Sequence, residues 1–278
     1  MPARTARAYV LQALALLLVP AAIAPARPPA PRPLVADSVP GFDTRVYPGD
    51  ATMARWKTAS PYRWVGYYLP APCQTGTTWV GRRAALRRMG WGLAVVFIGE
   101  QDWRAMPPDA ARRAGRDSAA LRGRPLRCTG SNLTAARGAA DAVEAERAAA
   151  ADGFPKGTVV YLDVERVDSV STRLSAYVRG WTAALLERGR YRPALYAHGR
   201  NAQSLYGVLR KEYARRGVAG RPRLWVTSSQ GSDPPNDPPA SGHGRANVWQ
   251  RLLNTRQTFG GVTLTIDVNV ADRASPSQ

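Results

Sequence analysis

The sequence has little lysine, histidine or cysteine, and each scarcity excludes a class of site. Its 278 residues include 39 lysines and arginines, of which only three are lysine, together with two cysteines and two histidines. Two cysteines cannot supply the ligands of a zinc ribbon. His198 and His243 stand in neither an H-x-E nor an H-x-x-x-H pattern. We therefore expect no metal and no other cofactor.

The motifs of several common enzyme classes are also missing. No G-x-G-x-x-G or G-x-x-x-x-G-K loop follows a predicted strand, which leaves nucleotide binding without support. There is no G-x-S-x-G elbow for a Ser-His-Asp hydrolase. The acid ladder of chitinase-like enzymes is absent too, because Tyr161 stands two positions before Asp163, where that ladder has an acid.

Acidic residues are scarce relative to basic ones, and the formal net charge is +19. A basic balance of this size is compatible with an anionic partner such as an acidic cell-wall polymer. The interpretation that we favour is a GC-rich genome, which enriches arginine and alanine. The arginines are scattered and form no stripe interleaved with aromatic residues, so we expect no nucleic-acid partner.

Long apolar runs are absent apart from Tyr9–Ile23, near the N-terminus. Arg4 and Arg7 precede this run and small residues follow it, as in a secretory signal. The run is shorter than the ~20 residues of a comfortable membrane span, although an uncleaved anchor is the competing interpretation. We expect a signal peptide at 1–24, a proline-rich linker at 25–40, and no stable membrane insertion after cleavage.

Export would place the two cysteines in a compartment where disulfides form. Cys73 and Cys128 would be an even pair in an oxidising compartment, and both follow predicted strands, so a disulfide is plausible. The alternative is a pair of free thiols in separate loops. We expect a secreted or cell-envelope protein that is a monomer.

Apolar runs and helical periodicities alternate along the remaining chain, and this alternation predicts the fold. The expected strands are 41–43, 64–69, 93–98, 157–165, 192–197, 223–227, 247–252 and 262–268. The expected helices are 50–57, 78–90, 132–152, 171–188 and 202–215. Strands that alternate with helices predict a parallel sheet, and about eight of them fit a closed barrel. We predict an α/β fold, an irregular TIM-like barrel over 41–272, with a tail at 273–278.

The strand at 157–165 ends in two acids. Residues i and i+2 of a strand share a face, so Asp163 and Glu165 project together. Asp43 ends the first predicted strand and Asp267 lies in the last, and these two strands are neighbours in a closed barrel. Clustered carboxylates repel, which raises the pKa of at least one of them. A proton donor beside a second carboxylate is the requirement for glycoside hydrolysis.

Four segments carry a resemblance to a known family: Gly41-Phe-Asp43, Asp163-Val-Glu165, Trp249-Gln250 and Ile266-Asp-Val-Asn269. In this order they resemble the family-25 glycoside hydrolases, the bacterial and phage muramidases. The sequence is still more similar to the exported bacterial glycoside-hydrolase-like family of Rv2525c-like type. The resemblance spans roughly 40–272 and implies about five βα units followed by three helix-poor strands.

The resemblance also implies roles for particular residues. Glu165 matches the general acid of the muramidases, and Asp163 matches the companion acid that assists the N-acetyl group or stabilises the cation. Asp43 and Asp267 match the flanking carboxylates. The expected sugar contacts are Tyr67, Tyr196, Trp225 and Gln250. Aromatic faces stack on sugar rings, although ordinary barrel packing would explain the aromatic residues equally well.

Together these features predict an exported bacterial glycoside hydrolase-like protein of lysozyme type, acting on the sugar backbone of peptidoglycan. The second strand, the long excursion at 99–130 and the loop at 231–245 depart from a compact muramidase. The alternative is therefore a non-catalytic envelope protein that retains the barrel and its acids and binds cell-wall polysaccharide.

Overall fold

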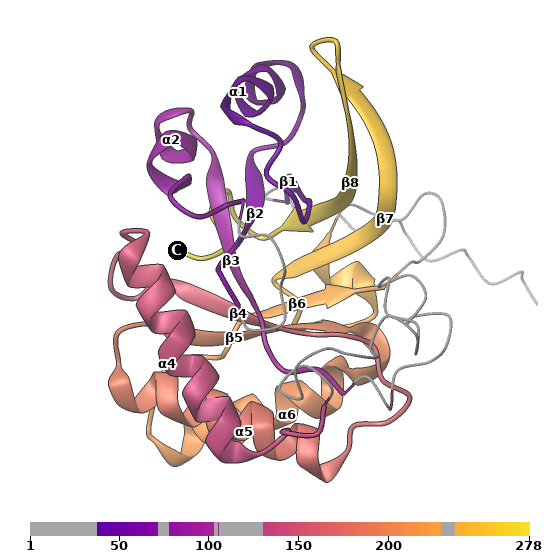
Figure 1. Ribbon diagram of the computed structural model, residues 1–278. Coiled ribbons are helices and arrows are strands. Elements are labelled where there is room, and N and C mark those ends of the chain that lie inside the picture. Colours follow the sequence, from indigo (N-terminus) through magenta and orange to yellow (C-terminus); the bar gives the residue numbers. More distant parts are fainter. Residues whose placement is uncertain (1–37, 72–77, 103–104, 106–129, 229–236) are drawn as a thin grey trace, which may run out of the picture. The chain divides into compact units, whose positions relative to one another are not determined.

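Eight strands form the framework of the protein, in a computed structural model that describes residues 38–71, 78–102, 105, 130–228 and 237–278 (Figure 1). The strands are β1 (Val39–Asp43), β2 (Trp64–Tyr68), β3 (Gly92–Ile98), β4 (Val159–Val164), β5 (Arg192–His198), β6 (Leu224–Thr227), β7 (Val248–Phe259) and β8 (Val262–Ala271). They pair in chain order into a closed barrel. Strands β1 to β7 run parallel, whereas β8 is antiparallel to both β7 and β1. The predicted irregular TIM-like barrel is confirmed.

Helices connect the first six strands. They are α1 (Asp50–Ala59), α2 (Arg83–Arg88), α4 (Ala135–Ala151), α5 (Thr172–Arg188) and α6 (Gly199–Arg215). Thr134 and Ser171 begin α4 and α5 by accepting backbone N–H groups with their hydroxyls, and Gly189 ends α5 in the left-handed conformation. Between β6 and β7 the described residues hold only the short 3₁₀ turn η2 (Pro238–Ser241). No described helix is long and apolar enough to span a membrane.

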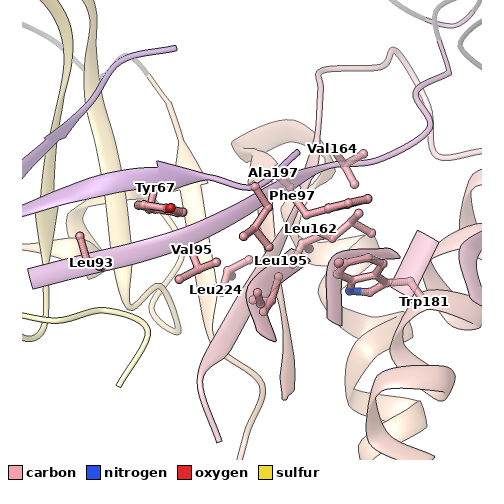
Figure 2. Close-up of a cluster of buried hydrophobic side chains, with 14 of the residues drawn as sticks. Tyr67, Leu93, Val95, Phe97, Leu162, Val164, Trp181, Leu195, Ala197 and Leu224 are labelled. Carbon is pink, nitrogen blue, oxygen red and sulfur yellow. The ribbon is translucent and has the colours of Figure 1, made fainter. Parts of the chain in front are cut away.

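Alternation along the strands produces two apolar layers. One row of side chains fills the barrel interior, and its large members include Trp64, Tyr161 and Trp225. The opposite row faces the helices and forms the larger outer core, part of which Figure 2 shows around Phe97 and Trp181. Filling both faces of the sheet in this way leaves the polar ends of the strands as the natural place for a site.

Two elements differ from their predicted bounds. Strands β7 and β8 continue past the barrel as a long antiparallel hairpin, whose turn is Gly260-Gly261 with positive φ at both residues. The C-terminal residues are not a loose tail, because Ser277 bridges β3 and β4. Its N–H donates to the Leu93 carbonyl at 3.1 Å, and its own carbonyl accepts from the Val159 N–H at 2.9 Å. This bridge closes the end of the barrel opposite to Asp43.

Candidate active site

The pairing of β1 with β8 places two carboxylates side by side. Asp43 is the direct cross-strand partner of Asp267. Asp43 is only 3% exposed and accepts three hydrogen bonds, from the Tyr68 hydroxyl at 2.6 Å and from the side-chain amides of Gln250 and Asn269 at 2.8 Å each. Gln250 donates from the same nitrogen to Asp267 at 3.1 Å. One amide group therefore holds both carboxylates.

Burial dominates the protonation of Asp43. Desolvation raises the pKa of its carboxyl above the ordinary value, and the hydrogen bonds from Tyr68, Asn269 and Gln250 act in the opposite direction without cancelling it. Residue 66 leaves room for this carboxyl, since a Cβ on Gly66 would lie 2.6 Å from the Asp43 Cβ. The glycine of β2 is thus part of the reason that an acid fits here.

Asp267 has a second fixed partner on β7. Two register shifts flank this position, one between Gln250 and Leu252 and one between Leu252 and Thr255. They bring Asn254 into the left-handed region, at φ 51°, and its N–H donates to Asp267 Oδ1 at 2.6 Å. Bulges of this kind re-aim groups beside functional sites.

The proton affinity of Asp267 is high for a carboxyl group. Burial raises its pKa to about 7, and the negative charges of Asp43 and, to a smaller extent, Glu165 act in the same direction. The hydrogen bond from Asn254 opposes them. A carboxyl group of this kind changes its charge close to neutral pH.

The other two acids lie at the end of β4. Asp163 is its penultimate residue, is 6% exposed and pairs in register with Ile98 and Tyr196. Glu165 follows directly after the strand and is half-buried. Gln101 holds this end of the chain, because its side-chain amide donates to the Asp163 carbonyl at 2.7 Å and its oxygen accepts the Glu165 N–H at 2.9 Å.

Tyr196 marks the point at which the four acids converge. Its hydroxyl donates to Gln250 Oε1 at 2.7 Å. Burial raises its pKa well above the ordinary value, and the charges of the four carboxylates contribute in the same direction. The contributing carboxylates are Asp163, Glu165, Asp43 and Asp267. These four acids and Tyr196 form the mouth of the barrel, at the C-terminal ends of the parallel strands, the usual place of barrel active sites.

The expected sugar contacts divide into two groups. Tyr196 lies half-buried in the mouth. Gln250 lies beside it but is only 2% exposed, and its amide is taken up by hydrogen bonds to Asp43, Asp267 and Tyr196. Trp225 lies deeper, 1% exposed inside the barrel, where its indole N–H donates to Asn269. Tyr67 faces outward into the outer core (Figure 2), is fully buried, and donates its hydroxyl to Asp152 at 2.6 Å. As placed, neither Tyr67 nor Trp225 presents a ring face to a ligand, and the expectation for these two is corrected.

Sequence reasoning missed three groups that the structure adds to the mouth. Tyr68, rather than its neighbour Tyr67, points inward to Asp43, and the alternation of β2 with Trp64 on the inner row would have identified it. Asn269 was visible only as part of the family motif. Gln101 could not have been found, because it acts on β4 from a chain segment 62 residues away.

No metal-binding cluster of three or more His, Cys, Asp or Glu residues occurs in the part of the chain that the structure describes. His198 instead begins α6, with its Nδ1 accepting the Arg200 N–H at 3.2 Å. His243 lies beside this helix start, since a Cβ on Gly199 would be 3.5 Å from its Nε2. The predicted partners Cys73 and Cys128 both lie outside the described residues.

One protein family matches most of the chain. The family described as the Rv2525c-like, glycoside hydrolase-like domain matches residues 54–271. No curated protein matches the chain.

Similar folds occur among solved structures. An uncharacterized B. stearothermophilus protein has 19% identity and a TM-score of 0.53, over 84% of this chain and 96% of its own. The spore cortex lytic enzyme SleM of Clostridium perfringens has 17% identity and a TM-score of 0.51, over 87% of this chain and 68% of its own. The autolysin LytC of Streptococcus pneumoniae has 11% identity and a TM-score of 0.52, over 84% and 46%. At these identities the likeness is one of fold.

Proposed function

The chain belongs to the Rv2525c-like glycoside hydrolase-like family, and from that premise we propose that it hydrolyses the sugar backbone of peptidoglycan. The observation that carries the proposal is the cluster of acids at one end of the barrel. Gln250 is hydrogen-bonded to Asp43, Asp267 and Tyr196, and Asp163 stands next to Tyr196 on the neighbouring strand, with Glu165 two residues further along. Fold likeness adds a weaker argument, because SleM is named as a spore cortex lytic enzyme, and LytC as an autolysin whose structure has also been solved with a synthetic peptidoglycan ligand.

In the proposed reaction Glu165 donates a proton to the glycosidic oxygen. Glu165 and Asp267 are the two half-buried acids of the cluster, whereas Asp43 and Asp163 are buried, and of these two Glu165 is the one that matches the general acid of the muramidases. As the bond breaks, positive charge develops on the sugar ring, and Asp163 and Asp267 stabilise it electrostatically. Water then adds to the anomeric carbon, and the proton that it loses replaces the one given by Glu165. Asp43 acts on Asp267 through its charge, and Gln250 keeps the two carboxylates in place.

The test is the release of reducing ends from purified cell walls. We expect Glu165→Gln to abolish release, because the amide cannot donate the proton, while Glu187→Gln on the exposed surface of α5 should leave release unchanged. Absence of release by the unmodified protein from every wall preparation would exclude the enzymatic function. Equal release by Glu165→Gln would exclude this residue as the donor.

A second function is favoured by the net charge of +19. An envelope protein could retain the four acids and bind an anionic wall polymer through its arginines without cleaving it. In that case wall binding weakens steeply as salt concentration rises, since screening reduces contacts between exposed charges. Binding that is insensitive to salt, together with release of reducing ends, favours the hydrolase.

The same proposal includes export. Residues 1–24 would act as the signal and 25–40 as a linker to the barrel. The protein would then work in the bacterial cell envelope, as a monomer. Mass spectrometry of the mature protein tests this, because cleavage near residue 24 shifts its mass by the signal peptide.

A further inference from the structure

The hairpin of β7 and β8 extends beyond the mouth of the barrel. Asp267 marks the level of the mouth because it is paired with Asp43, the last residue of β1. Residues 262–266 precede it on β8 and have no partner on β1. At about 3.4 Å per residue, Thr263 lies about 14 Å beyond Asp267 along the strand. Figure 1 shows this part of the hairpin projecting beside α1.

One face of the hairpin is covered by α1. The Trp56 indole donates to the Val262 carbonyl at 3.0 Å, and Phe259 packs edge-on against Trp56 at a ring distance of 5.2 Å. The Tyr62 hydroxyl, just after α1, donates to Gln257 at 2.6 Å. This is therefore the outer face, continuous with the outer core of the barrel.

The opposite face is exposed and polar. It carries Arg256, Thr258, Thr263 and Thr265, all of them exposed. Arg256 stands opposite Thr265, and Thr258 stands opposite Thr263 with their hydroxyl oxygens 2.7 Å apart. Within the described part of the chain, none of the ion pairs involves Arg256.

This exposed face continues the row of the active site. Residues two apart on a strand share a face, so Thr263, Thr265, Asp267 and Asn269 form one row of β8. The last two of these belong to the mouth. The side-chain amide of Asn269 donates a hydrogen bond to Asp43, and Asp267 accepts one from Gln250. The hydroxyls of Thr265 and Thr263 therefore follow the carboxylate of Asp267 along β8, on the side of the strand that faces the mouth.

We propose that this face, defined by Arg256, Thr258, Thr263 and Thr265, binds the glycan strand next to the bond that is cleaved. Threonine hydroxyls both donate and accept hydrogen bonds, which suits sugar hydroxyl and N-acetyl groups. The guanidinium of Arg256 suits a carboxylate on the strand. The inference rests on the proposed function, since the glycan is the one that the four acids would cleave.

Binding to long glycan strands tests the proposal, with Glu165→Gln as the parent protein to prevent turnover. The ligands are soluble uncrosslinked peptidoglycan strands, which are acidic, and chitin oligomers of similar length, which are neutral. Titration calorimetry with the full chain gives the dissociation constants. Thermal unfolding of each variant checks that it is folded.

Replacing Thr263 and Thr265 with valine keeps the shape and strand preference and removes both hydroxyls. We expect about tenfold weaker binding to both ligands, as for the loss of one or two hydrogen bonds. Arg256→Gln should weaken binding about tenfold for the acidic strand only. Arg88→Gln, an exposed change of equal charge on α2, should have little effect.

The outcomes separate the two ideas. If the threonine and arginine variants bind both ligands like the parent, the hairpin face is not a binding surface, whatever the unmodified protein does to cell walls. If the variants bind less tightly but the unmodified protein releases no reducing ends, the face stands as a glycan site and hydrolysis is excluded. If the parent binds neither ligand, the face is not a glycan site, and release of reducing ends by the unmodified protein decides separately whether it is a hydrolase. Should the valine variant fail to fold, Arg256→Gln alone decides between these outcomes.

Discussion

Removing the charge of Asp43 should lower the pKa of Asp267. The two carboxylates accept hydrogen bonds from one nitrogen of Gln250, at 2.8 and 3.1 Å, so the oxygens involved are at most about 6 Å apart. At an effective dielectric constant of about 20, two unit charges at about 6 Å repel by about 3 kcal/mol, which corresponds to about two pKa units. In Asp43→Asn we therefore expect the pKa of Asp267 to fall from about 7 to about 5.

The same change should alter the pH dependence of stability. A carboxyl whose pKa is raised in the folded state binds protons more tightly there than in the unfolded chain, so its stabilising contribution is complete below about pH 4 and is lost as pH rises to about 7. Asp43 acts in the same direction. Asp43→Asn removes the pH-dependent contribution of Asp43 and narrows the pH range over which the contribution of Asp267 is lost. The decline in the free energy of unfolding between pH 4 and 7 should therefore become shallower.

Carboxyl NMR of labelled aspartate measures the first effect, and urea unfolding at several pH values measures the second. The asparagine also places an amide where three donors converge on Asp43, which should cost about 1–3 kcal/mol at every pH. This loss of unfolding free energy is the same at every pH, so it can be separated from the change in the slope of unfolding free energy against pH. An Asp267 pKa that stays near 7 in the variant would refute the coupling, and burial alone would then explain the shift.

Three further predictions concern other parts of the barrel. Asp272 has its pKa lowered, chiefly by Arg223, so Asp272→Asn should reduce the free energy of unfolding at pH 7 and have no effect in strong acid, the opposite sign to Asp267. A Cβ on Gly92 would lie 1.6 Å from the Ala274 carbonyl oxygen, so Gly92→Ala should cost about 2 kcal/mol or more in urea unfolding, whereas Gly207→Ala in α6, with open space around it, should be neutral or stabilising. Gln101→Met removes both hydrogen bonds at the end of β4, and kcat on wall glycan should fall about tenfold with KM nearly unchanged; an unchanged kcat would show that Gln101 has no positioning role.

Much of the fold was predictable because its signals are local. The apolar run of β3 and the alternation of β4 depend on residues adjacent in sequence, and both strands lie where they were expected. The bounds of β7 and β8 were wrong because their outer halves are stabilised by packing on α1, which lies about 200 residues earlier. The bridge formed by Ser277 was missed for the same reason.

The sequence by itself determined the barrel, the family and the four acids, since strand ends, alternation and motif order are written in consecutive residues. Only the tertiary structure decided how those acids are held. Burial and mutual repulsion raise the pKa of Asp267, and both depend on closing β8 against β1. Solvation and charge interactions are set by distances in space, and these become defined only when the two ends of the sheet meet.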